Sequence, residues 1–465
     1  MERAMRRLFW FFAALFVVLI GNLTYWQVFA APRLNTDPSN TRAVERQMRV
    51  ERGVILTADG VEAATNTQED VYFFRTYPDG SLFAPWLGYN SIRYGRAGVE
   101  RVYNPELAGE LDILQITNII DLVTGKPRRG ADVRLTVDAD VQRAAAEALG
   151  DRAGAVVALD PKTGAVLAMT SYPRYDPNTL ESDWDSLLSA EGRPLFDRAV
   201  QGTYAPGSVF KVIVAAAALQ EGVVVTDAPF DDTGSFTAGG YEVTNFGDEA
   251  YGQHTFSDAL VKSINTTFAK VGVDLGAATL GRYAGAFGVG SDLPWKLGGE
   301  TGSFPNAAGM DTAHVAQVSF GQGEVLVSPL EMALVAAGIA NGGTIMEPFI
   351  VSEVRDYRQT LLQRTQPQVW KRPITAATAQ TVSELMVRAV EEGTGTNAAI
   401  EGVKVAGKTG TAEVDEGESH AWFIAFAPAD DPQVAVAVIV EHGGTGGTAA
   451  APIARSVIQA ALAQE

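Results

Sequence analysis

No feature narrows the possible folds more than an apolar run near the N-terminus, Leu8 to Phe29, which follows Arg3, Arg6 and Arg7. As a helix that rises about 1.5 Å per residue, this run spans the roughly 30 Å hydrocarbon core of a bilayer. Positive charges flank cytoplasmic ends of membrane helices, so the bulk of the chain is expected outside the cytoplasm. The sequence therefore predicts a cytoplasmic tip and a single transmembrane anchor within residues 1–31.

A cleaved signal peptide is the alternative interpretation of the same segment. Its cleavage site would be Val28-Phe29-Ala30-Ala31, which matches the small-residue pattern poorly. The apolar run is also longer than a usual signal core, and this favours an uncleaved anchor.

The bulk composition indicates an acidic globular protein with more than one domain. A chain of 465 residues is too long for one ordinary core, and 46% hydrophobic residues argue against long disorder. The net charge of −19 offers no basic surface for nucleic acid. With no cysteine, and four histidines that form no H-x-x-x-H pair, neither a disulfide nor a metal site is expected, and no cofactor is implied.

The pattern of apolar and turn-forming residues divides the remainder of the chain into two predicted domains. Short apolar runs alternate with turns from Arg42 to about Gly130, which is typical of a small, irregular, mixed domain. The pattern changes near Val133. We therefore expect domains at 32–132 and 133–465, the first opening with a polar linker at Ala31–Thr41.

The second domain is expected to combine an antiparallel sheet with helices. Apolar strands at Ala155–Leu159 and Ala165–Met169 flank a Pro/Gly turn and predict a hairpin. Because strands and helices lie at both ends of the region around a helical middle, an α/β sandwich is predicted. The other predicted elements are helices at 141–149, 209–220, 257–271, 329–339, 376–392 and 452–463, and strands at 422–427 and 434–440.

Ser208 and Lys211 form the only S-x-x-K of the chain. Pro206-Gly207 places Ser208 at a helix start, where unpaired N–H groups favour developing negative charge. Lys211 lies one turn later on the same face. A serine needs a base in hydrogen-bond reach, and a lysine can serve if burial and neighbouring cations lower its pKa. A serine cap beside a solvated lysine is the plainer alternative.

Two further polar motifs follow at intervals of 55 and 145 residues. Ser263-Ile264-Asn265 lies in a polar stretch that makes a poor helix interior, and a simple helix break would also explain it. Lys408-Thr409-Gly410-Thr411 follows an apolar segment and is typical of a strand edge, where glycine permits close approach of a substrate backbone. A second K-T-G begins at Lys162, but Asp160-Pro161-Lys162-Thr163-Gly164 has ordinary turn chemistry, so we assign it to the hairpin turn.

In this order, S-x-x-K, S-x-N and K-T-G resemble the three catalytic motifs of penicillin-binding proteins and serine β-lactamases. The pairing of Lys408–Thr411 with His420-Ala421-Trp422-Phe423 is similar to that family, and Glu51–Ile55 and Gly98–Glu100 resemble the pedestal signatures of its class B members. The resemblance implies an α+β fold: a penicillin-binding/serine β-lactamase-like transpeptidase domain with an antiparallel sheet flanked by helices, a small mixed N-terminal pedestal domain and one transmembrane helix.

The resemblance also implies a role for each motif residue. Ser208 would be the nucleophile and Lys211 its base, with Ser263 relaying the proton to the leaving amine. Asn265 would bind the side-chain amide of the substrate and orient Lys211, while Lys408 would keep Lys211 deprotonated. Thr409, Gly410 and Thr411 would bind the substrate, the two threonines through its terminal carboxylate. The backbone N–H groups of Ser208 and Thr411 would form the oxyanion hole.

A class B penicillin-binding protein is a membrane-anchored peptidoglycan D,D-transpeptidase, so the resemblance implies cross-linking of stem peptides in the bacterial cell wall and covalent inhibition by β-lactams. It also implies a membrane glycosyltransferase of the shape-elongation-division-sporulation (SEDS) family as partner. Two alternatives stay open. Water as acceptor would make the chain a D,D-carboxypeptidase or a β-lactamase, and loss of catalysis would leave a wall scaffold or β-lactam sensor.

Overall fold

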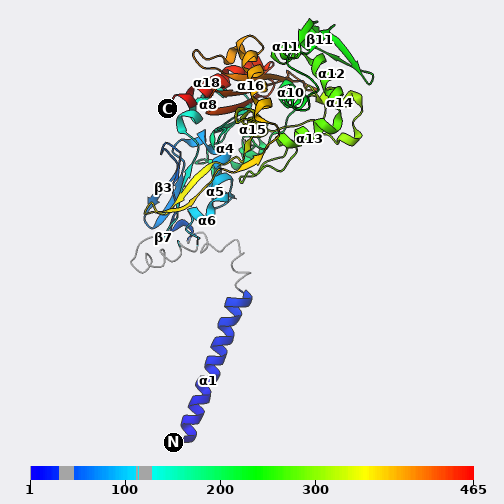
Figure 1. Cartoon of the computed structure of the whole chain (residues 1–465). Coiled ribbons are helices and arrows are strands. Elements are labelled where there is room, and N and C mark those ends of the chain that lie inside the picture. Colours follow the sequence, from blue (N-terminus) through cyan, green and yellow to red (C-terminus); the bar gives the residue numbers. More distant parts are fainter. Residues whose placement is uncertain (1, 31–44, 46, 112–113, 115–127, 465) are drawn as a thin grey trace.

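The computed structural model of the chain describes residues 2–30, 45, 47–111, 114 and 128–464 (Figure 1). The N-terminal segment is helical throughout, as α1 (Glu2–Thr24) followed by the π-helical η1 (Tyr25–Ala30). Residues Glu2–Phe29 are long and apolar enough to cross a membrane, so the predicted apolar helix is present. The predicted linker at Ala31–Thr41 and the end of the alternative cleavage site lie outside the described residues.

The smaller domain contains a six-stranded sheet in the order β17-β16-β8-β2-β3-β4. These strands are β2 (Ile55–Leu56), β3 (Glu62–Glu69), β4 (Tyr72–Thr76), β8 (Asp132–Leu135), β16 (Val351–Arg355) and β17 (Leu361–Arg364). Two of them, β16 and β17, come from the far side of the predicted boundary at 132/133, and β8 crosses it. The sheet therefore ties the two parts of the chain together, while the boundary itself stays a prediction.

The two pedestal signatures meet in one buried ion cluster. Glu100 is fully buried and accepts from Arg52 Nη2 at 2.7 Å and from Arg75 Nε at 2.5 Å. Burial alone would raise the pKa of Glu100, but the two guanidinium groups outweigh it and hold that pKa below its ordinary value. The cluster joins α5 (Gly98–Val102) to the strands of the pedestal sheet.

The larger domain is built on a five-stranded antiparallel sheet in the order β10-β9-β21-β20-β19. Its strands are β9 (Gly154–Leu159), β10 (Val166–Tyr172), β19 (Ala406–Ala412), β20 (His420–Ala427) and β21 (Val434–Val440). This confirms the predicted hairpin and late strands. The K-T-G motif lies on β19, which has a neighbouring strand on one side only and is therefore an edge strand of the sheet.

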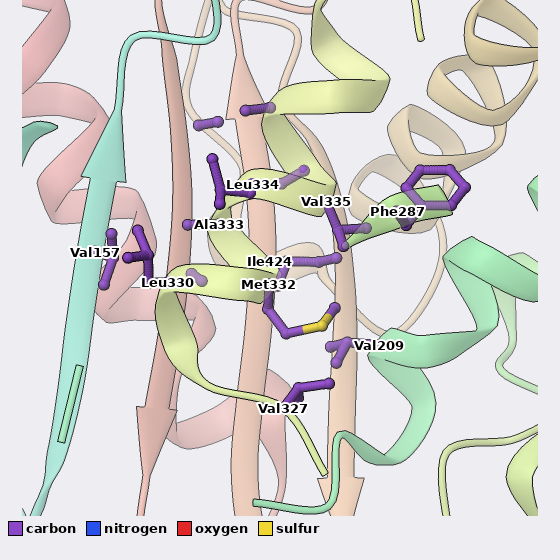
Figure 2. Close-up of a cluster of buried hydrophobic side chains, with 14 of the residues drawn as sticks. Val157, Val209, Phe287, Val327, Leu330, Met332, Ala333, Leu334, Val335 and Ile424 are labelled. Carbon is purple, nitrogen blue, oxygen red and sulfur yellow. The ribbon is translucent and has the colours of Figure 1, made fainter. Parts of the chain in front are cut away.

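Helices cover both faces of this sheet. On one face α8 (Ala139–Leu149) and α18 (Ala451–Leu462) pack against the alanines and valines of β9 and β21. On the other face lies α15 (Pro329–Ala340), whose Leu330 points toward Val157 of β9 (Figure 2). This helix is buried almost completely, and α16 covers the sheet near β19.

The middle of this domain is not all-helical, and here the sequence-based expectation was wrong. Four short strands form two hairpin-like pairs before the second motif: β11 (Pro229–Asp232) pairs with β14 (Gly252–Thr255), and β12 (Ser235–Ala238) pairs with β13 (Tyr241–Thr244). Each strand has only four residues, too few to establish an alternating pattern. The turn of the inner pair depends on Gly239 and Gly240, both at positive φ.

The remaining elements connect these layers. The helices are η2 (Gly80–Leu82), α4 (Ala84–Leu87), α6 (Asn104–Leu107), α9 (Leu180–Ser189), η3 (Gly207–Phe210), α10 (Lys211–Gln220), η4 (Phe246–Asp248), α11 (Phe256–Val261), α12 (Asn265–Leu275), α13 (Ala277–Phe287), η5 (Ala307–Gly309), α14 (Thr312–Val318), α16 (Ala376–Glu391), η6 (Thr396–Ala398) and α17 (Gly446–Ala449). The short strands are β1 (Val50–Glu51), β5 (Asn90–Ser91), β6 (Gly95–Arg96), β7 (Arg128–Arg129), β15 (Ile345–Met346) and β18 (Val369–Lys371).

Candidate active site

Ser208 lies at the start of a buried helix, as predicted, but the first turn is a 3-10 turn. The turn η3 contains Ser208, and α10 continues directly from Lys211. This tight entry requires glycine at 207, because φ is +55° there and a Cβ would lie 2.5 Å from the carbonyl oxygen of Thr411. The serine turn therefore rests directly on strand β19.

The second motif interrupts a helix. A continuous helix over Ser257–Val271 was predicted, and this was wrong: α11 ends at Val261 and α12 begins at Asn265. Ser263 has a φ of +63°, in the left-handed region that few residues other than glycine adopt. Such strain clusters at functional sites. Here it turns the Ser263 carbonyl toward Lys211, whose Nζ donates to it at 2.7 Å.

The three motifs converge on the Ser263 hydroxyl. Lys408 Nζ donates to Ser263 Oγ at 2.9 Å, and Lys211 Nζ lies 3.3 Å from the same oxygen. Lys211 also donates to Asn265 Oδ1 at 2.7 Å. The side-chain amide of Asn265 in turn donates to the backbone carbonyl of Thr244 at 3.0 Å, so strand β13 fixes its orientation.

Both lysines are fully buried, and this controls their charge. Burial, reinforced by the positive charge of Lys408, lowers the pKa of Lys211 well below its ordinary value. Burial lowers the pKa of Lys408 to about 7. The lowered pKa of Lys211 favours its neutral form, which can take a proton, while Lys408 exchanges its proton near pH 7.

Strand β19 presents the third motif beside the serine turn. Lys408 and Thr409 are buried and Thr411 is half-buried. Gly410 also has a packing role: a Cβ there would lie 2.9 Å from the Pro206 carbonyl oxygen and 3.0 Å from Val209 Cγ1. Glycine at 410 thus lets β19 pack against the serine turn itself.

Four side chains that the sequence did not single out position these motifs. Trp422 Nε1 donates to the Ala205 carbonyl at 3.0 Å and Tyr204 donates to Glu441 at 2.7 Å, so β20 and the residue that follows β21 hold the chain before Ser208. The hydroxyls of Thr394 and Thr409 lie 2.6 Å apart. Tyr204 and Trp422 fall within segments that resemble the family, but nothing in the sequence marks Thr394 or Glu441.

The second K-T-G sequence lies away from this centre. Lys162 lies in the exposed turn between β9 and β10 and pairs with Asp431 at 2.5 Å. In the described part of the chain, no group of three or more His, Asp or Glu side chains is arranged to hold a metal ion.

Comparisons with known proteins agree with this arrangement. The profile of the family described as "Penicillin binding protein transpeptidase domain" matches residues 154–459, and that described as "Penicillin binding protein A dimerisation domain" matches residues 52–133. Proteins named peptidoglycan D,D-transpeptidase PbpA are 38% identical, from Mycolicibacterium smegmatis over 99% of both chains and from Mycobacterium tuberculosis over 100% of both.

Solved structures are similar over most of the chain. Penicillin-binding protein A from M. tuberculosis, in an imipenem acyl-enzyme complex, has a TM-score of 0.85 at 36% identity and covers 90% of this chain and 100% of that one. The D,D-transpeptidase domain of a peptidoglycan glycosyltransferase from Eggerthella lenta has a TM-score of 0.83 at 34% identity, covering 90% and 99%.

Proposed function

We propose that this chain, which belongs to the penicillin-binding protein transpeptidase family, is a peptidoglycan D,D-transpeptidase that β-lactams inhibit covalently. The observation that carries the proposal is the convergence of two buried lysines on the Ser263 hydroxyl, one of which, Lys211, follows Ser208 by three residues. A proton path between a nucleophile and a leaving group requires such a chain of groups.

In the acylation step, Ser208 Oγ attacks the carbonyl carbon between the last two D-alanines of a donor stem peptide, and its proton passes to neutral Lys211. The backbone N–H groups of Ser208 and Thr411 bind the oxyanion. Ser263, which contacts both lysines, passes its proton to the departing amine and receives the proton that Lys211 took from Ser208. D-alanine leaves, and an ester joins the donor peptide to Ser208. The lowered pKa of Lys211 supports its role as base.

In the second step, an amine from a neighbouring stem peptide attacks the ester carbonyl. Its proton returns through Ser263 and Lys211 to Ser208 Oγ as the ester bond breaks. A new amide bond forms, and the serine is regenerated. Deacylation therefore uses Ser263 and Lys211 in the reverse direction, because both steps are attacks on a carbonyl carbon.

The K-T-G strand and Asn265 orient the donor. Thr409 and Thr411 bind the terminal carboxylate, Gly410 keeps β19 against the serine turn, and the charge of Lys408 favours the anion. The side-chain oxygen of Asn265 accepts a hydrogen bond from Lys211. Asn265 also binds the side-chain amide of the donor. A β-lactam carries a similarly placed carboxylate and a reactive carbonyl, which explains covalent inhibition.

We assign the cytoplasmic tip and anchor to residues 1–31, the pedestal to 32–132 and the transpeptidase domain to 133–465. The N-terminal helix holds the catalytic part at the outer face of the bacterial cell membrane, near lipid-linked or nascent glycan. Because a transpeptidase needs glycan strands to cross-link, we further propose a SEDS-family membrane glycosyltransferase as partner.

The test is labelling of the full-length chain in detergent with fluorescent penicillin. Wild type should form a stable adduct, Ser208→Ala should form none, and Ser189→Ala, at an exposed serine on α9, should label like wild type. A stem-peptide donor and an acceptor amine should then yield a cross-linked product. Rapid loss of label with ring-opened product would indicate a β-lactamase. Hydrolysis of the donor without formation of a cross-link would indicate a carboxypeptidase. Absence of any adduct in folded protein would refute the proposal in favour of a scaffold.

A further inference from the structure

Thr394 contacts the substrate-binding strand from outside the three motifs. It follows α16 and is exposed at the rim of the site. Its Oγ1 lies 2.6 Å from Oγ1 of Thr409, which is itself 7% exposed. A hydroxyl pair at this distance shares one hydrogen bond, so the proton of one threonine points at the oxygen of the other.

The backbone around Thr394 holds this hydroxyl in place from several sides. Its N–H donates to the Val261 carbonyl of α11 at 3.4 Å, and Gly395 N–H donates to the Ala389 carbonyl at 2.9 Å. On the opposite side, a Cβ at Gly447 would lie 2.7 Å from the Thr394 carbonyl oxygen. Thr394 thus sits in a fixed position between α11, β19 and α17, rather than on a free loop.

The direction of the shared hydrogen bond decides what Thr409 can bind. A carboxylate only accepts hydrogen bonds, so Thr409 must direct its own proton toward the substrate. If Thr409 donated to Thr394 instead, its oxygen lone pairs would face the anion and repel it. When Thr394 donates to Thr409, both requirements are met: the Thr409 oxygen is satisfied, and its proton is left for the carboxylate.

We propose that Thr394 is a positioning residue that donates its hydroxyl proton to Thr409 and so makes Thr409 a donor selective for ligands with a terminal carboxylate. The inference rests on the proposed function, in which Thr409 binds that carboxylate. Thr394 needs no contact with the substrate, because it acts through the oxygen of its neighbour. Hydrogen bonds in such a chain strengthen one another.

The experiment compares acylation of the full-length protein by a penicillin and by its methyl ester, which carries no negative charge. Thr394→Val keeps the shape of the side chain and removes the hydroxyl, while Thr394→Ser keeps the hydroxyl. Thr396→Val makes the same change two residues along the chain, at the exposed first residue of η6, and serves as the matched control. The second-order acylation rate constant and the melting temperature are measured for each variant.

We expect Thr394→Val to slow acylation by the free acid by about 3- to 10-fold, the effect of one hydrogen bond, with little change for the ester. Thr394→Ser should restore the wild-type ratio of the two rate constants, and Thr396→Val should leave that ratio unchanged. Equal slowing of acid and ester would assign Thr394 a purely structural role, and no slowing of either would show that Thr409 is oriented without it. Failure of wild type to react with either ligand would instead refute the proposed function, and this inference with it.

Discussion

Gly410 offers the sharpest test of how the site is assembled, because its missing side chain sets the distance between β19 and the serine turn. In Gly410→Ala, the new Cβ would lie 2.9 Å from the Pro206 carbonyl oxygen, 2.9 Å from Trp422 Cβ and 3.0 Å from Val209 Cγ1. The Pro206 oxygen is backbone and Trp422 Cβ is the first side-chain carbon of a strand residue, so both atoms are held rigidly. The strand must therefore move away from the turn by a few tenths of an ångström.

Such a displacement has two consequences of different size. Overpacking of a dense core costs about 1–3 kcal/mol of stability. Because a misplacement of about 1 Å can lower a rate by about 100-fold, a smaller shift between Ser208 and Thr411 should slow acylation by about 10- to 100-fold. The matched control is Gly285→Ala inside α13, where no heavy atom beyond the surrounding helix backbone lies within 4 Å of the new Cβ. This control should stabilise the protein by about 0.5–1 kcal/mol and leave acylation unchanged.

The measurements are the acylation rate constant with fluorescent penicillin and the unfolding midpoint of both variants. Slow acylation with a modest loss of stability would support the coupling of strand and turn. If Gly410→Ala reacted at the wild-type rate, the argument that β19 sets the position of the serine turn would be wrong, whatever its stability.

Three further predictions concern charge and packing. Lys211→Ala should abolish penicillin labelling while Ser208 is intact, and retained labelling would exclude Lys211 as the base. Folding lowers the pKa of Lys408 from an ordinary 10.5 to about 7, so the unfolded chain binds more protons between these values and the folded state gains stability as pH rises from 7 to 10. The difference in unfolding free energy between wild type and Lys408→Met should show this rise, by up to a few kcal/mol at about 1.4 kcal/mol per pKa unit, and a flat difference would contradict the buried charge. Leu330→Ala, in the core between α15 and β9 (Figure 2), should cost about 2–5 kcal/mol in denaturant unfolding, and a loss below 1 kcal/mol would contradict the dense packing described.

The elements that the sequence predicted correctly are those with strong local patterns. The apolar strands β9 and β21 were predictable because burial on both sides leaves a nearly continuous apolar run, and the Ala-rich α8 because Asp138 caps its start and Gly150 ends it. The short hairpin strands before the second motif were not, since β12 and β13 have four residues each and only one buried residue each. Their function in the site, which is to hold Asn265 through the Thr244 carbonyl, depends on a contact between distant segments and leaves no local signal.

The same distinction explains which parts of the active site the sequence could indicate. The motif residues were identifiable because serine, lysine and asparagine at fixed spacings have few other reasons to occur together. Thr394 was not, because a threonine after a helix is ordinary and only the fold brings it to Thr409. The helix break at Ser263 lies between these cases: the polar composition suggested it, but only the left-handed φ of Ser263 explains how one residue offers both its carbonyl and its hydroxyl to Lys211. A regular helix would commit that carbonyl to its own backbone ladder, so Lys211 would lose its hydrogen bond to the Ser263 carbonyl. The strain at Ser263 is therefore a requirement of the site rather than a defect of the helix.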